Sequence, residues 1–230
     1  MKKSTDTLNS KYSQYQLIHE KRFQAIINQL TSIRKKKGRD IKILDVGAHS
    51  LYLLSSLHAL SFRNLYGIDV DTFINEIDEE TIESFNLKVC DLQDESVPFK
   101  DNYFDVIVMS EVIEHLYFNP MGCLIDLKRT LQPGGKLIIT TPNIFRIANT
   151  VKMLTCKNIF ALPSKGPSGH FKEYSMQDLE DFANLCNLKV TDAKLRNLFR
   201  NPSKTANFFM QLLSLVSPRR KDSIHITLEK

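Results

Sequence analysis

Short, almost continuously apolar segments alternate with helical segments along most of this 230-residue chain, and this alternation limits the fold more than any other feature of the sequence. Parallel strands are apolar on both faces because helices cover both sides of their sheet. The pattern therefore predicts an α/β fold with a doubly wound, mostly parallel seven-stranded sheet and an antiparallel edge strand. The segments that we interpret as strands are residues 41–46, 64–69, 87–90, 104–109, 136–141, 189–195 and 223–229.

An N-terminal helix is predicted to precede the sheet. Its apolar residues follow the i, i+3, i+4, i+7 spacing of one buried face, and they are Phe23, Ile26, Ile27, Leu30 and Ile33. A basic run that begins at Arg34 ends at Gly38, which is a common way for a helix to end. We therefore divide the chain into an N-terminal helical segment, residues 1–40, and a single further domain, residues 41–230.

Further helices are expected at residues 50–60, 120–132 and 174–187, the last with Ser175 as its N-cap. The least regular stretch is residues 144–169, which contains two prolines and two glycines near its end. Long irregular loops inside a compact domain usually serve a function. We interpret this stretch as a lid or substrate loop.

Composition and charge narrow the class of protein. The chain is 42% hydrophobic and 25% charged, as is ordinary for a globular protein. The net charge of +5 is modest, and the basic clusters lack interleaved aromatic residues, which argues against nucleic acid as a partner. No apolar run reaches the length of a membrane span; the run at 208–216 is interpreted as core or as a homodimer face. Four cysteines without a CxxC pair are expected to be reduced thiols in the cytoplasm.

Polar residues follow the first four predicted strands, at the edge where a doubly wound sheet binds its ligand. Gly47 follows the first strand, and Asp69 ends the second strand 22 residues later, the separation typical of a carboxylate that binds ribose hydroxyls. Asp91 follows the third strand, and Ser110 and Glu111 follow the fourth. Each acid alone is compatible with a solvated loop or a helix cap, but their shared position predicts a nucleotide-like cofactor site.

Four motifs make the chain similar to the class I S-adenosylmethionine-dependent methyltransferases, which have a Rossmann-like fold. They are ILDVG (43–47), YGIDVD (66–71), VCDLQDESVPFKDNYFDVIVMSEVIEHL (89–116) and LKRTLQPGGKLIITTPN (127–143). The resemblance spans roughly residues 41–190 and implies S-adenosyl-L-methionine as the cofactor. The positions that it assigns to the cofactor are Asp45 and Gly47 at the methionine part, Asp69 at the ribose hydroxyls, Val70, Asp91 and Leu92 around the adenine, and Ser110 near the sulfonium.

The first turn departs from the family pattern Gly-x-Gly-x-Gly, because His49 and Leu51 replace the second and third glycines. His49 therefore joins the residues expected to line the cofactor, although its ring is assigned no chemistry. A residue other than glycine in a left-handed conformation costs roughly 1–2 kcal/mol, and about 1.4 kcal/mol corresponds to tenfold in affinity. We expect cofactor binding to be weakened rather than abolished. A dinucleotide such as NAD is the lesser interpretation.

Two stretches are candidates for the acceptor side, SEVIEH (110–115) and GHFKEYS (169–175). The candidate catalytic residues are His115 and His170, either as a general base for a hydroxyl or as metal ligands. If a helix begins in the first stretch, its two glutamates and its histidine share one face. The set Glu111, Glu114, His115 and His170 resembles the Glu-x-x-Glu-His motif and later histidine of metal-dependent ubiquinone-biosynthesis and small-RNA terminal 2′-O-methyltransferases, which would imply a divalent cation such as Mg or Mn.

The same stretches also resemble metal-independent relatives that methylate sugars. Those relatives show TPN after strand five and a later GHxxxY segment, present here as Thr141-Pro142-Asn143 and as Gly169, His170 and Tyr174. The function expected first is therefore O-methylation of a hydroxyl on a small-molecule sugar or glycan precursor. The alternatives are metal-dependent methylation of a vicinal diol, in a catechol or a terminal ribose, and a catalytically idle subunit that keeps the fold. The intact acids at the strand ends argue against the idle subunit.

Overall fold

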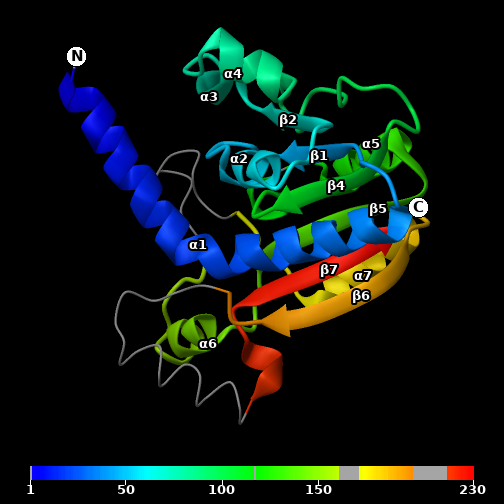
Figure 1. Ribbon diagram of the computed structural model, residues 1–230. Helices are drawn as coiled ribbons and strands as arrows, with labels where there is room; N and C mark the ends of the chain where they lie inside the picture. The colour runs from blue at the N-terminus through cyan, green and yellow to red at the C-terminus, as the bar shows by residue number, and fades with distance from the viewer. Residues whose placement is uncertain (1, 117, 161–170, 199–216) are drawn as a thin grey trace.

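The computed structural model describes residues 2–116, 118–160, 171–198 and 217–230, with side chains from residue 19 onward. Its centre is a seven-stranded sheet with the strand order β3-β2-β1-β4-β5-β7-β6 (Figure 1). The strands are β1 (Ile43–Val46), β2 (Leu65–Asp69), β3 (Leu87–Val89), β4 (Phe104–Ser110), β5 (Leu131–Pro142), β6 (Lys189–Arg196) and β7 (Ser223–Glu229). The first five strands are parallel, and β7 lies antiparallel between β5 and β6. The predicted fold class and its antiparallel edge are thus confirmed.

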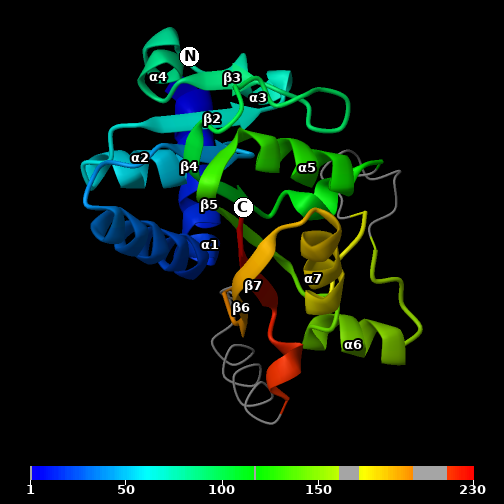
Figure 2. The ribbon, with the colours of Figure 1, turned by 90° about the vertical axis from the view of Figure 1, so that its right-hand side faces the viewer.

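Helices cover both faces of the sheet, with α1 and α2 on one face and α5 and α7 on the other (Figure 2). The helices are α1 (Lys2–Lys37), α2 (Tyr52–Ala59), α3 (Asp71–Ile74), α4 (Glu79–Ser84), α5 (Pro120–Thr130), α6 (Ile147–Leu154) and α7 (Met176–Leu185), with short 3₁₀ helices η1 (Ile113–His115) and η3 (Pro218–Arg220). Ser175 caps α7 in a reciprocal pair with Asp178, so its predicted role as N-cap is confirmed.

The core consists of two apolar layers, one on each face of the sheet. On the α1 face, Ile26 packs with Ile43 of β1 and Val106 of β4. The next residue of each strand, Leu44 and Ile107, belongs to the layer on the opposite face, and all five side chains are fully buried. Successive side chains of a strand point to opposite faces. β1 and β4 therefore supply both layers, which explains why their sequences are continuously apolar.

Strand β5 begins at Leu131, directly after α5, rather than at the predicted residue 136. Residues 132–135 bulge out of its ladder with β4. Gly134 in this bulge has a φ of 71°, a backbone conformation that glycine adopts at little cost. The predicted helix (120–132) and strand (136–141) leave Pro133, Gly134 and Gly135 as a connection between them. In the structure these three residues lie inside β5, as part of its bulge.

Polar contacts fix α1 to the sheet in addition to its apolar stripe. The Nε2 of Gln29 donates to Oγ1 of Thr227 over 2.7 Å, and its Oε1 lies 2.8 Å from Nε2 of His225, both on β7. At the end of the helix, Lys37 donates to the buried carboxylate of Asp105 at the start of β4 over 2.8 Å. The helix therefore lies along the sheet from the carboxyl ends of the parallel strands to their opposite ends (Figure 1).

Two predicted features lie partly or wholly outside the described residues. Of the expected lid, residues 144–169, the structure describes the part up to residue 160, which contains α6. The remainder of the lid and the apolar run at 208–216 are not among the described residues. None of the described helices is long and apolar enough to cross a membrane.

Residues 144–149, which follow β5, are hydrogen-bonded to residues 173 and 174, which precede α7. Arg146 and Asn149 both bond to the carboxylate of Glu173, which is 2% exposed, with Nδ2 of Asn149 donating over 2.6 Å. The N–H of Ile144 donates to the carbonyl oxygen of Tyr174 over 2.9 Å. The two segments therefore lie side by side next to the carboxyl end of β5.

Candidate active site

The turn after β1 uses its single glycine where a side chain would not fit. Gly47 has a φ of 75°, and a Cβ at this position would lie 2.5 Å from Cγ2 of Val112. Leu51, in the third glycine position of the family pattern, also has a left-handed backbone, with a φ of 52°. His49 packs its ring against Phe73, with ring centroids 4.6 Å apart. The conformational cost expected from the missing glycines therefore falls on Leu51.

Asp69 brings a half-buried carboxylate, with one fully buried oxygen, to the end of β2. Its Oδ1 accepts a hydrogen bond from the N–H of Val70 over 2.8 Å, whereas its buried Oδ2 has no hydrogen-bond partner among the described residues. Burial raises the pKa of Asp69, and the backbone N–H of Val70, the ring of His49 and the backbone N–H of His49 oppose this shift. The N–H of His49 is therefore close to the carboxylate but does not satisfy Oδ2 with hydrogen-bond geometry. A buried acceptor without a partner costs free energy unless a ligand satisfies it. Asp69 thus fits the role of binding a ligand hydroxyl.

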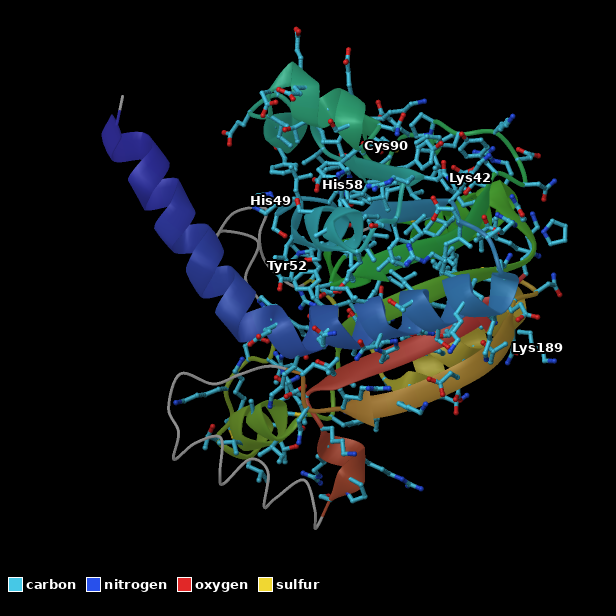
Figure 3. All side chains as sticks on the ribbon, viewed as in Figure 1. Lys42, His49, Tyr52, His58, Cys90 and Lys189 are labelled. Atoms are coloured by element: carbon cyan, nitrogen blue, oxygen red, sulfur yellow. The ribbon has the colours of Figure 1, made fainter. Side chains whose placement is uncertain are left out.

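The turn and Asp69 meet at the carboxyl end of the parallel strands. Figure 3 shows His49 at this end of the sheet and Lys42, which precedes β1, at the opposite end. β1 pairs with β2 on one side and with β4 on the other, so the strand order reverses at this point. Ligands of open α/β sheets bind outside the carboxyl ends of the strands at such a reversal.

Two buried ionisable side chains, Asp45 and Arg22, lie beside the turn. Asp45 of β1 is 6% exposed, and Arg22 of α1 is 1% exposed. Burial raises the pKa of Asp45 well above its usual value, the Asp69 carboxylate adds to the rise, and Arg22 opposes it. Sequence reasoning missed Arg22. The signal was its place four residues before Ile26, on the buried stripe of the helix.

A chain of hydrogen bonds links the ends of β4 and β5. The hydroxyl oxygens of Ser110 and Thr140 lie 2.9 Å apart, and Oγ1 of Thr140 donates to Oε1 of Glu111 over 3.1 Å. The other carboxylate oxygen of Glu111 lies 3.5 Å from Nη1 of Arg22. Glu111 has a left-handed backbone, with a φ of 57°. Thr140, which the sequence analysis did not identify, links Ser110 and Glu111 by hydrogen bonds.

Glu114 is a fully buried acid on the acceptor side. Its Oε2 accepts a hydrogen bond from Oγ1 of Thr141 over 2.9 Å, and its buried Oε1 has no partner within the described part of the chain. Burial raises the pKa of Glu114 well above its usual value, and the neighbouring Glu111 adds to the rise. Burial, with Glu114 as the next cause, raises the pKa of Tyr174 to about 12. Glu114, Thr141 and Tyr174 therefore lie together.

Of the four predicted metal ligands, the structure describes Glu111, Glu114 and His115 but not His170, so the metal site stays a prediction. Among the described residues, no three His, Cys, Asp or Glu side chains are placed to hold an ion together. The expected helix is a 3₁₀ turn of three residues, Ile113–His115, and Glu111 precedes it in a left-handed conformation. Glu111 turns toward Arg22, and Glu114 turns toward Thr141, so the two carboxylates have different partners. The half-buried His115 is described, but His170 lies outside the described residues.

Asp91 and Leu92, predicted at the adenine, follow β3. The carboxylate of Asp91 accepts a hydrogen bond from the N–H of Gln93 over 3.0 Å, and its own N–H donates to Glu95 over 2.8 Å. Leu92 packs against the core layer on the α5 face. These contacts fix a loop at the carboxyl edge, adjacent to the end of β2.

Comparison with known families and curated proteins gives consistent matches. A family described as methyltransferase domain matches residues 44–139. The ubiquinone biosynthesis O-methyltransferase of Rickettsia akari is 25% identical over 201 residues, covering 83% of this chain and 78% of that protein. The human mitochondrial enzyme of the same name is 31% identical over 164 residues, covering 65% of this chain. The chain spans 53% of the Dictyostelium discoideum relative and 42% of the human one, about half of these eukaryotic proteins or less.

Solved structures share the fold. A SAM-dependent methyltransferase from Archaeoglobus fulgidus superposes with a TM-score of 0.60 at 14% identity, covering 90% of this chain and 94% of that one. Another from Aquifex aeolicus gives a TM-score of 0.53 at 17% identity, covering 87% and 88%.

Proposed function

Because the chain is a class I S-adenosylmethionine-dependent methyltransferase, we propose that it transfers the methyl group to a hydroxyl oxygen of a small molecule. The observation that carries this proposal is the buried Oδ2 of Asp69, which has no partner among the described residues and lies beside the glycine turn. An idle subunit would have no use for a carboxylate in this state, since the group costs stability without a ligand.

The chain's own residues would hold the cofactor as follows. Asp69 accepts hydrogen bonds from the ribose hydroxyls, and Gly47 leaves room for the backbone to approach the methionine part. Arg22 supplies the buried positive charge that a methionine carboxylate needs. The remaining proposed contacts are Asp45 and His49 in the first turn, Val70, Asp91 and Leu92 around the adenine, and Ser110 near the sulfonium.

S-adenosylmethionine supplies an electrophilic methyl group, so the protein must place the acceptor oxygen and remove its proton. His115 at the end of η1 is the described candidate for the base, and His170 remains a candidate from the sequence. Next to His115 in the chain, the fully buried Glu114 accepts a hydrogen bond from the hydroxyl of Thr141.

The acceptor class is proposed from two sources. The curated relatives are named as O-methyltransferases of ubiquinone biosynthesis, which supports oxygen as the methyl acceptor. The TPN and GHxxxY segments support a sugar or glycan-precursor hydroxyl. The free thiols of Cys90, Cys123 and Cys186 are buried, which is compatible with the proposed cytoplasmic location.

Calorimetric titration with S-adenosylhomocysteine tests the cofactor site. Wild-type protein is expected to bind, and Asp69→Asn to lose roughly tenfold or more in affinity, because an amide cannot accept from both ribose hydroxyls as a carboxylate does. Asp71→Asn is the matched control, since Asp71 is an exposed acid two residues away. Equal affinity of wild type and Asp69→Asn would contradict the proposed placement of the ribose.

An acceptor screen with catechols and free or nucleotide-linked sugars, with and without magnesium, tests the reaction. Transfer to a sugar hydroxyl without metal, lost in His115→Gln while S-adenosylhomocysteine binding persists, is the expected result. Metal-dependent transfer to a catechol would replace this acceptor proposal with the vicinal-diol alternative.

A further inference from the structure

We propose that Glu111 is a positioning residue that fixes the guanidinium of Arg22 at the carboxyl edge of the sheet, so that α1 becomes the wall against which the anionic end of the cofactor binds. This inference rests on the proposed function, because it concerns the same site.

The first support is the burial of an ion pair between two distant elements. Arg22 is 1% exposed on α1, and the side chain of Glu111 after β4 is 11% exposed. Their charged atoms, Nη1 and Oε2, lie 3.5 Å apart. Burial raises the pKa of Asp45 and of Glu114, and Arg22 opposes both rises, so its charge acts on both acids. The same Nη1 lies 3.0 Å from Nδ1 of His19 on α1, so the guanidinium has one neighbour on its own helix and one, Glu111, at the end of the sheet.

The second support is that Glu111 is held firmly by β5. Its N–H donates to the carbonyl oxygen of Thr140 over 2.8 Å, and its Oε1 accepts from the Thr140 hydroxyl over 3.1 Å. Ser110 in turn lies within hydrogen-bond distance of that hydroxyl, at 2.9 Å. Oε1 of Glu111 therefore accepts from β5, and the other oxygen, Oε2, faces Arg22. One residue of β5 thus sets both the backbone and the side chain of Glu111.

The third support is the backbone of Glu111, whose φ is 57°. A left-handed glutamate costs roughly 1–2 kcal/mol relative to the ordinary conformation. Such conformations persist where the surrounding structure imposes them, and they gather at functional sites. Here the left-handed residue turns its side chain from the end of β4 toward α1, which a continuing strand or helix would not do.

Calorimetry with two ligands separates positioning from general damage. S-adenosylhomocysteine carries the amino-acid part, whereas 5′-methylthioadenosine lacks it. Glu111→Gln keeps an oxygen for the Thr140 hydroxyl but places an amide opposite Arg22. We expect this variant to lose roughly tenfold in affinity for S-adenosylhomocysteine and to bind 5′-methylthioadenosine as the wild type does. Thr140→Val, which leaves both charges in place, is expected to show a smaller loss with the same selectivity.

A double-mutant cycle asks whether Glu111 acts through Arg22. Arg22→Met is expected to lose S-adenosylhomocysteine affinity selectively, and Glu111→Gln is expected to add almost nothing in that background. Additive losses, equal losses for both ligands, or tighter binding of S-adenosylhomocysteine by Glu111→Gln would overturn the inference. Failure of the wild type to bind S-adenosylhomocysteine would instead contradict the proposed function, and thermal unfolding of each variant identifies one that does not fold.

Discussion

Gly47 and Leu51 use a left-handed backbone for different reasons within one turn. At Gly47 the main chain also approaches Val112 closely, so both the conformation and the space require glycine. At Leu51 only the conformation is unusual, and its side chain packs against the apolar layer on the α1 face. The sequence shows that two motif glycines are absent. It does not show which replacement carries the cost, because the φ of each turn residue depends on how α2 begins.

Gly47→Ala is expected to cost more stability than Gly134→Ala. Both glycines have a positive φ, at 75° and 71°, but no atom lies within 4 Å of a Cβ at position 134. Gly134→Ala therefore measures the conformational cost alone, about 1 kcal/mol. Gly47→Ala adds the overlap with Val112 and should also weaken S-adenosylhomocysteine binding. Urea unfolding and calorimetry measure the two effects, and equal losses of stability would mean that Val112 moves freely aside.

The residues at the strand ends could be predicted, and their partners could not. Asp69 and Ser110 are placed by the alternation of strands, because the end of a parallel strand lies at the carboxyl edge. Asp45, inside β1, was assigned only by the family resemblance. Arg22 and Thr140 meet these residues only through the packing of α1 and the register of β5. Neither relation is present in the local sequence, although a charge on an apolar helical stripe indicates a buried partner.

At the scale of elements, β1, β2, β4, β6 and β7 agree with the predicted strands to within about two residues, the usual uncertainty of element boundaries. The condition stated for residues 110–115, that a helix begins there, is not met. The left-handed Glu111 interrupts the regular backbone, and only the 3₁₀ turn η1 follows.

The end of α1 depends on one buried carboxylate. Asp105 accepts hydrogen bonds from Lys37, from Arg39 and from the N–H of Lys42. Burial raises the pKa of Asp105, but these three donors outweigh burial and lower it. The stabilisation by ionised Asp105 is therefore complete above 3.8, the usual pKa of an aspartate, and is lost as the pH falls below it.

Asp105→Asn is expected to lower the free energy of unfolding by roughly 1–3 kcal/mol, because the donors lose their charged partner. Glu229→Gln is the matched control, because it removes the ion pair between Lys136 and the Glu229 side chain, which is 36% exposed. This variant should lower the free energy of unfolding by at most about 1 kcal/mol. Urea unfolding near neutral pH compares the two variants. A larger loss in Glu229→Gln would show that Asp105 does not anchor α1.

For the whole molecule, the alternation of strands and helices predicted a sheet covered by helices on both faces. The position of α1 on one of these faces could be predicted only in part. The apolar stripe predicted burial of α1, and the contacts of Gln29 with His225 and Thr227 show that it also packs on the antiparallel part of the sheet. Helix α1 therefore contacts both β7 and the proposed cofactor site. A substitution that loosens α1 should affect both the stability of the fold and the geometry of that site.

The pH dependence of global stability is expected to report on His225. Burial lowers the pKa of His225 to about 4, with Arg196 and Lys194 in the same direction and Asp192 opposed. Since the unfolded value is 6.5, the unfolded chain binds more protons between these two values, and the fold loses stability as the pH falls from 6.5 toward 4. Burial also lowers the pKa of His19 to about 3, so His19 contributes a loss in the same direction. In urea unfolding at pH 7.5 and 5, His225→Gln should therefore show a smaller loss than the wild type, whereas the variant His58→Gln, at an exposed histidine, should show the full loss. An unchanged pH dependence in His225→Gln would assign the effect to other groups.

The position of β7 between β5 and β6 has a consequence for synthesis on the ribosome. Within the part of the chain that the structure describes, β6 pairs only with β7, and so does the side of β5 that faces away from β4. Residues 223–229 are nevertheless translated after both strands. While they are being translated, β5 and β6 are unpaired edges whose free N–H and C=O groups can pair with another chain. The nascent protein therefore depends on rapid completion of translation, or on a chaperone that covers these edges, before its sheet can close.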